Sequence, residues 1–220
     1  MTRLVALVVA LGACGSSTTP APATDRPAPA TPAALLVPPV GKLAITDEWV
    51  GPTKAFRAVG KAVPVDQLRQ VTEALGLPVS GTADIDIALE VPNGSAAQIV
   101  GHARVACTKC RIGDDSHLDF DRIDVALDVA NGRAEITRWK VESPDLELEL
   151  SGHVELASAL GSSQVTGCVR FRPSEALRTG NPKTFALFSV TGAPLGDDGF
   201  YSIALEGTID TMKRLGRVCH

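Results

Sequence analysis

The sequence lacks the motifs that mark common catalytic sites. It contains no Gly-x-Ser-x-Gly nucleophile elbow, no glycine-rich phosphate loop and no His-Glu-x-x-His zinc motif. Aromatic residues make up only 4% of the chain, and the net charge of −4 comes without any cluster of Lys and Arg interleaved with aromatics. Nucleic-acid-binding domains carry such basic clusters. We therefore expect a protein that is not an enzyme, needs no cofactor and binds no nucleic acid.

The apolar run near the N-terminus is too short to cross a membrane. It covers residues 4–11 and follows Arg3, whereas a transmembrane helix needs about 20 apolar residues. A cation, a short apolar run and then small residues form the layout of a secretory signal. We expect residues 1–13 to be a signal peptide that is removed on export.

The residues after this run, Leu11-Gly12-Ala13-Cys14, resemble the lipobox of bacterial lipoproteins. By that resemblance Cys14 becomes the first residue of the mature protein and carries acyl chains, which anchor the chain to a membrane. An ordinary signal peptide with an incidental cysteine is the alternative. Gly15, in place of Asp, favours the outer membrane by analogy with lipoprotein sorting. The expected location is the cell envelope, lipid-anchored and facing the periplasm.

Residues 14–39 predict a lipidated cysteine followed by a disordered tether, and residues 40–220 a single β-rich domain. Proline excludes helix and sheet from the tether. The prolines of this segment are Pro20, Pro22, Pro27, Pro29, Pro32, Pro38 and Pro39.

Hydrophobic alternation with a period of two dominates the domain. Apolar residues alternate with polar ones over 85–91, 146–156, 165–171 and 203–209, which is typical of strands with one buried face. The predicted fold is mainly β: an antiparallel sheet or incomplete sandwich of amphipathic strands with a few short helices.

A hairpin is the clearest local prediction. Asn131-Gly132 lies between two alternating runs, which is the strongest short hairpin signal. A two-residue turn there places apolar residues opposite one another: Leu127 opposite Ile136, and Val129 opposite Ala134.

Helical spacing is rarer in the sequence. An amphipathic helix is expected over Val65–Leu75, because Leu68, Val71 and Leu75 repeat with helical spacing. Residues 40–64 are expected to be a short β segment. Shorter helices are predicted over Ser174–Arg178, Lys183–Val190 and Thr211–Leu215.

Four cysteines remain besides Cys14: Cys107, Cys110, Cys168 and Cys219. An even number in an exported chain predicts two disulfides, for which three pairings are open. Extended residues three apart lie about 10 Å from each other, so a Cys107–Cys110 bond requires a turn at Thr108-Lys109. A thioredoxin-like redox site is disfavoured because no helix follows Cys107.

Metal binding is a weaker alternative for two groups of residues. Zinc would need Cys107 and Cys110 with two histidines, but no second Cys-x-x-Cys or His-x-x-x-His accompanies them. The histidines considered are His102, His117, His153 and His220. Calcium could bind an acidic group that lacks the order of an EF-hand loop: Asp114, Asp115, Asp119, Asp121 and Asp124. We assign no metal site to either group.

Four segments together resemble the type II secretion system protein N family over residues 65–212. They are Gly76–Gly81, Gly101–Asp114, Ser143–Gly152 and Val169–Ser174. The resemblance implies a non-catalytic accessory that binds other components of the secretion machine, and it carries no catalytic residue. Family members are expected to be longer and to begin with an inner-membrane helix. Their strand-rich character is similar to that of envelope proteins with apolar grooves, so a lipid or apolar-ligand carrier is the second expectation.

Overall fold

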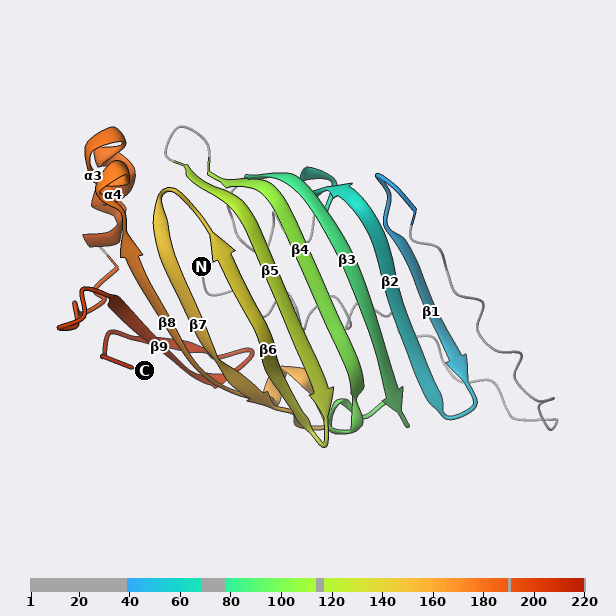
Figure 1. Cartoon of the computed structure of the whole chain (residues 1–220). Helices are drawn as coiled ribbons and strands as arrows, with labels where there is room; N and C mark the ends of the chain where they lie inside the picture. Colours follow the sequence, from blue (N-terminus) through green and yellow to red (C-terminus); the bar gives the residue numbers. More distant parts are fainter. Residues whose placement is uncertain (1–38, 69–77, 114–116, 190, 220) are drawn as a thin grey trace.

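Ten strands form one antiparallel sheet in which every strand pairs with its neighbours in the sequence (Figure 1). A computed structural model describes residues 39–68, 78–113, 117–189 and 191–219. The prediction of a mainly β fold with a few short helices is confirmed, and all ten strands belong to a single antiparallel sheet. The strands are β1 (Ala44–Val50), β2 (Thr53–Pro64), β3 (Val79–Pro92), β4 (Val100–Ile112), β5 (Leu118–Ala130), β6 (Arg133–Glu142), β7 (Leu146–Glu155), β8 (Gln164–Pro173), β9 (Tyr201–Thr208) and β10 (Lys213–Leu215).

Alternation gives the sheet two chemically different faces. Ile85, Ile87 and Leu89 of β3 are buried, whereas Asp84 and Glu90 are exposed. Residues directly opposite in adjacent strands share a face, so the register carries this division across the sheet. One apolar row consists of Ile45, Ala58, Ile87, Ala103, Leu127 and Ile136, from β1 to β6.

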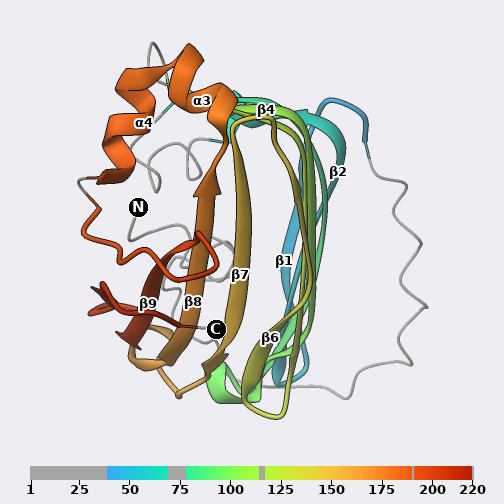
Figure 2. The ribbon, with the colours of Figure 1, turned by 60° about the vertical axis from the view of Figure 1, so that its left-hand side comes forward.

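The sheet is bent, and we call the apolar, concave side of this bend the trough. Figure 2 shows that β7, β8 and β9 turn away from the layer formed by β1–β6, so that the two parts enclose a concave side. Register shifts interrupt the ladders between Gly60 and Val63, Ser80 and Thr82, and Ala126 and Leu127. Such bulges bend a strand and increase its twist. Ile87 of β3 and Phe171 of β8 belong to one core cluster. Side chains of these two strands can meet only on the side toward which the sheet bends, so the apolar rows lie on the concave side.

Two short helices follow β8 at one end of the trough (Figures 1 and 2). They are α3 (Glu175–Gly180) and α4 (Pro182–Ser189). The hydroxyl of Ser174 accepts a 3.0 Å hydrogen bond from the amide of Leu177, which caps α3. Both helices confirm the sequence predictions, although the prediction for the second also included Val190, which lies outside the described residues.

The predicted hairpin is confirmed in its register. Leu127 pairs with Ile136, and Val129 with Ala134. Asn131 and Gly132 both have positive φ, 53° and 73°, as a two-residue turn that follows strand twist requires.

Two helix predictions are wrong where the structure tests them. At residues 211–215 a turn leads into β10, because Lys213–Leu215 pairs with the edge of β9. The expected helix from Val65 is only a 3₁₀ turn, Val65–Gln67, because Val63 and Val65 are both buried and continue the period of the strand. Residues 69–77 of that prediction lie outside the described residues. The segment 40–64 contains the β1–β2 hairpin, more regular structure than the short β segment expected.

Candidate functional site: an apolar trough

The floor of the trough is lined by aliphatic side chains. Ile87, Ala83 and Ala103 are almost completely buried, whereas Val105 and Ile123 are half-buried on the same side. A second row crosses nine strands from Asp47 to Gly207, and every member between its ends is apolar or glycine. It consists of Asp47, Phe56, Leu89, Gly101, Val129, Ala134, Val154, Val165 and Gly207.

The opposite wall carries a cluster of three aromatic side chains. Phe171 of β8 stacks against Tyr201 of β9 with ring centroids 5.5 Å apart. Its other neighbour is Phe188 of α4, at 5.2 Å. Leu146 and Leu148 of β7 belong to the same core or pack against it. Helix α4 therefore covers one end of the aromatic wall.

The strands of the floor, β1–β6, separate from those of the wall, β7–β9, between β6 and β7 (Figure 2). Among the described residues, the ladder between these strands comprises Arg133–Glu155, Ala134–Val154 and Glu135–His153 only. Farther along, the indole Nε1 of Trp139 donates a 3.0 Å hydrogen bond to the carbonyl of Leu148. A side chain thus joins the two strands where their backbones do not pair.

The charged residues of the trough rows lie at one rim. Asp47 and Lys54 face each other there and form a 3.1 Å ion pair. Lys54 pairs with Trp49 in the β1–β2 ladder, so the ion pair lies at the β1 edge. The middle of the trough rows is without charge.

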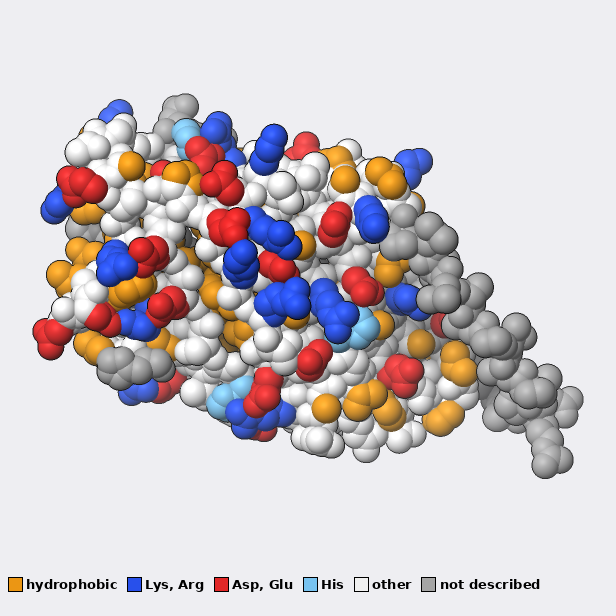
Figure 3. All heavy atoms as spheres, viewed as in Figure 1, with side chains coloured by type: hydrophobic (Ala, Val, Ile, Leu, Met, Phe, Trp, Pro, Cys, Tyr) orange, Lys and Arg blue, Asp and Glu red, His pale blue; other side chains and the backbone are white. Residues whose placement is uncertain are grey.

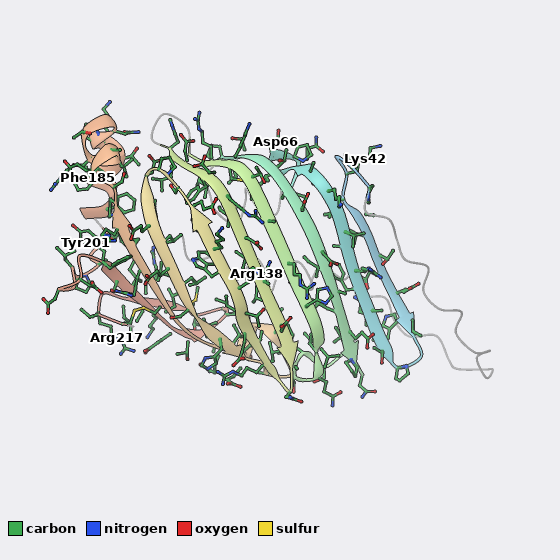
Figure 4. All side chains as sticks on the ribbon, in the orientation of Figure 1. Lys42, Asp66, Arg138, Phe185, Tyr201 and Arg217 are labelled. Atoms are coloured by element: carbon green, nitrogen blue, oxygen red, sulfur yellow. A yellow bond between two sulfur atoms is a disulfide. The ribbon has the colours of Figure 1, made fainter. Side chains whose placement is uncertain are left out.

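The convex face is charged and internally paired. Figure 3 shows Lys, Arg, Asp and Glu gathered over the middle strands, and Figure 4 places Arg138 there. Asp124 lies between Arg122 at 3.2 Å and Arg138 at 3.4 Å. Ion pairs between exposed strands contribute little to stability. Their physical effect is to keep this face hydrated, whereas the opposite face of the sheet is apolar.

A polar cluster fixes the start of β5 to the β6–β7 loop. Arg111 donates a 2.7 Å hydrogen bond to Asp119, and this contact holds the pKa of the Asp119 carboxyl below its ordinary value. The amide of Asp119 donates to the carboxylate of Asp145 at 2.7 Å, and the Ser143 hydroxyl donates to the carbonyl of Asp119 at 2.5 Å.

A second exposed contact lies nearby on the convex side. The ammonium of Lys140 lies 2.5 Å from Glu142, and this contact lowers the pKa of the Glu142 carboxyl. Both shifted carboxyls are surface groups paired with cations, as structural ion pairs are, and neither points into the trough.

The four cysteines form two pairs at disulfide distance. Cys107 and Cys110 have Cα atoms 6.1 Å apart, and Cys168 and Cys219 have Cα atoms 5.9 Å apart. The first pair needs the predicted turn, which Lys109 supplies with a φ of 51°. The second pair attaches the C-terminal segment to β8. The structure thus selects one of the three pairings that the sequence left open.

The residues considered for metals are dispersed or paired. Within the described ranges, no group of three His, Cys, Asp or Glu side chains could hold a metal ion. His102 lies 3.5 Å from Asp86, and His153 lies 3.5 Å from Glu155. Asp114, Asp115 and His220 lie outside the described residues. Asp119 and Asp124 of the acidic group face arginines instead of each other.

Comparison with known proteins gives no match. No family model matches the chain, and neither the curated proteins nor the solved structures contain a significant match. In the part of the chain that the structure describes, no helix has the length and apolar content needed to cross a membrane.

Sequence reasoning missed the aromatic residues of the site. Trp139 lies between Arg138 and Lys140, and its place in the β6 alternation was the available signal. The tilted contact of Phe171 with Phe188 joins a strand to a helix, and no local pattern predicts such a contact.

Proposed function

We propose that this protein is a non-catalytic envelope protein whose trough binds the apolar chain of a lipid or a similar ligand. The observation that carries the proposal is the composition of the concave side: apolar rows run across the bent sheet, and the charged pair Asp47–Lys54 lies at the rim. Acyl chains gain about 0.8 kcal/mol for each methylene that leaves water. An aliphatic trough supplies that environment without directional contacts.

The rim offers a place for a polar head group. Lys54 and Asp47 present one cation and one anion beside the apolar floor, so a ligand with a polar end and an apolar chain fits the arrangement. Ligand sites of this kind combine an apolar lining with a few polar groups that fix orientation. We take a single-chain or multi-chain membrane lipid as the ligand class.

The test uses the full chain carrying Cys14→Ser, which is expected to remain unlipidated and to be recovered without detergent. Native mass spectrometry of this protein should show a bound lipid, and a fluorescent fatty acid should bind and be displaced by phospholipid. A mass that corresponds to the protein alone, together with no fatty-acid binding, would contradict the proposal. If the Cys14→Ser protein still partitions into membranes, the lipoprotein expectation is wrong.

A matched pair of variants separates the trough from the general surface. Val105 faces the trough, and the adjacent Arg104 is exposed on the other side. Val105→Trp should fill the trough and reduce fatty-acid binding, whereas Arg104→Trp adds the same ring outside and should leave binding unchanged. Equal losses in both variants would show that binding is nonspecific. Circular dichroism of each variant checks that the sheet is retained.

A role as an accessory of type II secretion is the second candidate. It rests on the resemblance of residues 65–212 to the protein N family. Separately, the backbone of this chain requires glycine at two positions in the quoted segments. A Cβ on Gly101 would lie 2.0 Å from the carbonyl oxygen of Ala88, and one on Gly152 would lie 2.4 Å from that of Thr166. Both glycines have positive φ, 141° and 144°.

This candidate requires direct partners. Purification of the full-length protein from its own cells should recover the secretin or inner-membrane secretion proteins. Recovery of lipid without any of those proteins would contradict the secretion role and support the carrier role.

A further inference from the structure

The two edge strands of the sheet differ in length and in the contacts that hold them. β10 is only three residues long, and the segment after it is held by the Cys168–Cys219 pair and by an ion pair between Arg217 and Glu206. β1, at the other edge, is seven residues long and pairs only with β2 in the described sheet. In an antiparallel edge strand, alternate residues direct their N–H and C=O groups outward. No other described segment pairs with these outward groups of β1.

The β1 edge also carries the main group of exposed large apolar side chains. Ile45 is 57% exposed, Trp49 is 60% exposed and Val50 is 54% exposed. Edge strands usually avoid pairing with other chains by means of lysine, proline or strong bulges. The strand Ala44–Val50, with the sequence AITDEWV, contains no lysine or proline, and its charged residues are Asp47 and Glu48.

Two of these exposed side chains, Ile45 and Trp49, continue the trough, whereas Val50 lies on the opposite face with Glu48. Ile45 pairs with Ala58 and lies in the apolar row that includes Ile87. Trp49 is on the same face, and its ring lies 3.7 Å from the position that a Cβ on Gly94 would occupy. On this face of β1 the apolar Ile45 and Trp49 flank Asp47, which is paired with Lys54.

The charges of β1 favour a foreign strand over a second copy. Asp47 forms a partly exposed ion pair with Lys54, which offsets its charge only in part, whereas Glu48 has no ion-pair partner among the described residues. A two-fold pairing centred on β1 would place Asp47 opposite the Asp47 of the second copy. Like charges directly opposite in a ladder are destabilising. A partner strand with Lys or Arg opposite Glu48 avoids this repulsion.

We propose that the β1 edge is a strand-addition site for a partner protein whose added strand alternates apolar and basic residues. The backbone of the added strand would pair with β1, its apolar residues would cover Ile45 and Trp49, and its basic residues would face Glu48. The added strand would thus extend the trough by one strand. This interface does not depend on ligand binding in the trough, so either proposal can fail alone.

The probe is a synthetic peptide of alternating valine and lysine, about seven residues long to match an ordinary strand. Its binding to the full chain carrying Cys14→Ser is measured by isothermal titration calorimetry. Replacing lysine by glutamate, or methylating alternate backbone nitrogens, should each weaken binding about tenfold or more. Equal binding of all three peptides would overturn the proposal, because neither charge nor backbone pairing would then matter.

Variants of the protein assign binding to β1. Glu48→Lys should reverse the preference, so that the glutamate peptide binds better than the lysine peptide. Trp49→Lys should weaken binding, whereas Leu195→Lys, at a side chain of similar exposure (58%) far along the chain, should not. An unchanged charge preference in Glu48→Lys would overturn the proposal.

Self-association is tested separately with a photo-crosslinking residue in place of Thr46. Crosslinks in the producing cells to a partner segment of alternating apolar and basic residues support the proposal. Crosslinks exclusively to β1 of a second copy would overturn it in favour of a homodimer.

Discussion

The indole Nε1 of Trp139 donates a hydrogen bond to the carbonyl of Leu148 across the gap where β6 and β7 stop pairing. This bond takes the place of a ladder bond and links the floor of the trough to its aromatic wall. Trp139→Phe keeps a ring but removes the donor, and we expect it to lower the free energy of unfolding by about 1 kcal/mol. Urea unfolding measures this change. The control is Trp49→Phe, at an exposed indole, which should have almost no effect.

Side chains on the trough side should dominate stability. Ile87 is 1% exposed, so Ile87→Ala should cost about 2–5 kcal/mol through lost burial and the cavity it leaves. Leu148 is half-buried against the core and not fully enclosed, so Leu148→Ala should cost less. Glu147→Ala removes only an exposed ion pair with Arg172 and should cost below about 1 kcal/mol. Equal losses at Leu148 and Glu147 in urea unfolding would show that the assignment of faces is wrong.

The two cysteine pairs should contribute unequally. Cys168 and Cys219 are separated by 51 residues, for which the chain-entropy model gives about 4 kcal/mol. Cys107 and Cys110 are separated by only three, so their bond restricts the unfolded chain much less. Replacing both members of a pair by Ala, followed by thermal unfolding, compares them. Peptide mapping without reduction should find Cys107 joined to Cys110 and Cys168 to Cys219, and any other pairing would contradict the structure.

The Arg111–Asp119 contact predicts an acid-dependent contribution to stability. Because the folded protein lowers the pKa of Asp119 below its ordinary value of 3.8, the contribution is complete above that pH and is lost as pH falls through the folded pKa. Asp119→Asn should therefore destabilise the protein at neutral pH, by no more than about 1 kcal/mol since the pair is exposed.

The difference between wild type and Asp119→Asn should shrink in acid. Thermal unfolding of both proteins at neutral pH and below the ordinary aspartate pKa measures it. Asp121→Asn, at an exposed neighbouring position, is the control. A difference that stays constant with pH would show that Asp119 acts by some means other than its charge.

The sequence predicted local structure well wherever one period dominated. Alternation identified β3, β7 and β8 and the face on which Ile87 lies, and Asn131-Gly132 fixed the pairing of Leu127 with Ile136. Residues 211–215 are too few to distinguish the helical period from the strand period. Pairing with β9 makes Lys213–Leu215 a strand. The short helix predicted from Ser174 corresponds to α3, which the Ser174 hydroxyl caps in the structure.

The trough itself could be predicted only in part. An apolar face on one side of the sheet followed from alternation, but the bend depends on bulges such as the one between Ala126 and Leu127, which leave no clear mark in the sequence. The contact of Phe171 with Phe188 depends on how α4 returns toward β8. The gap that the Trp139 side chain bridges depends on where the backbone pairing of β6 with β7 ends. Each is a tertiary effect.

The order of the strands has a consequence for how the chain folds. Because each strand pairs with those next to it in the sequence, the contacts of the sheet are local and the contact order is low for an all-β protein. Most added strands close a short loop at small entropic cost, whereas β9 is reached through the longer connection that contains α3 and α4. A chain with this topology can grow its sheet strand by strand from its N-terminal side. The Cys168–Cys219 pair joins β8 to the C-terminal segment, so it can form only after the last strands are in place.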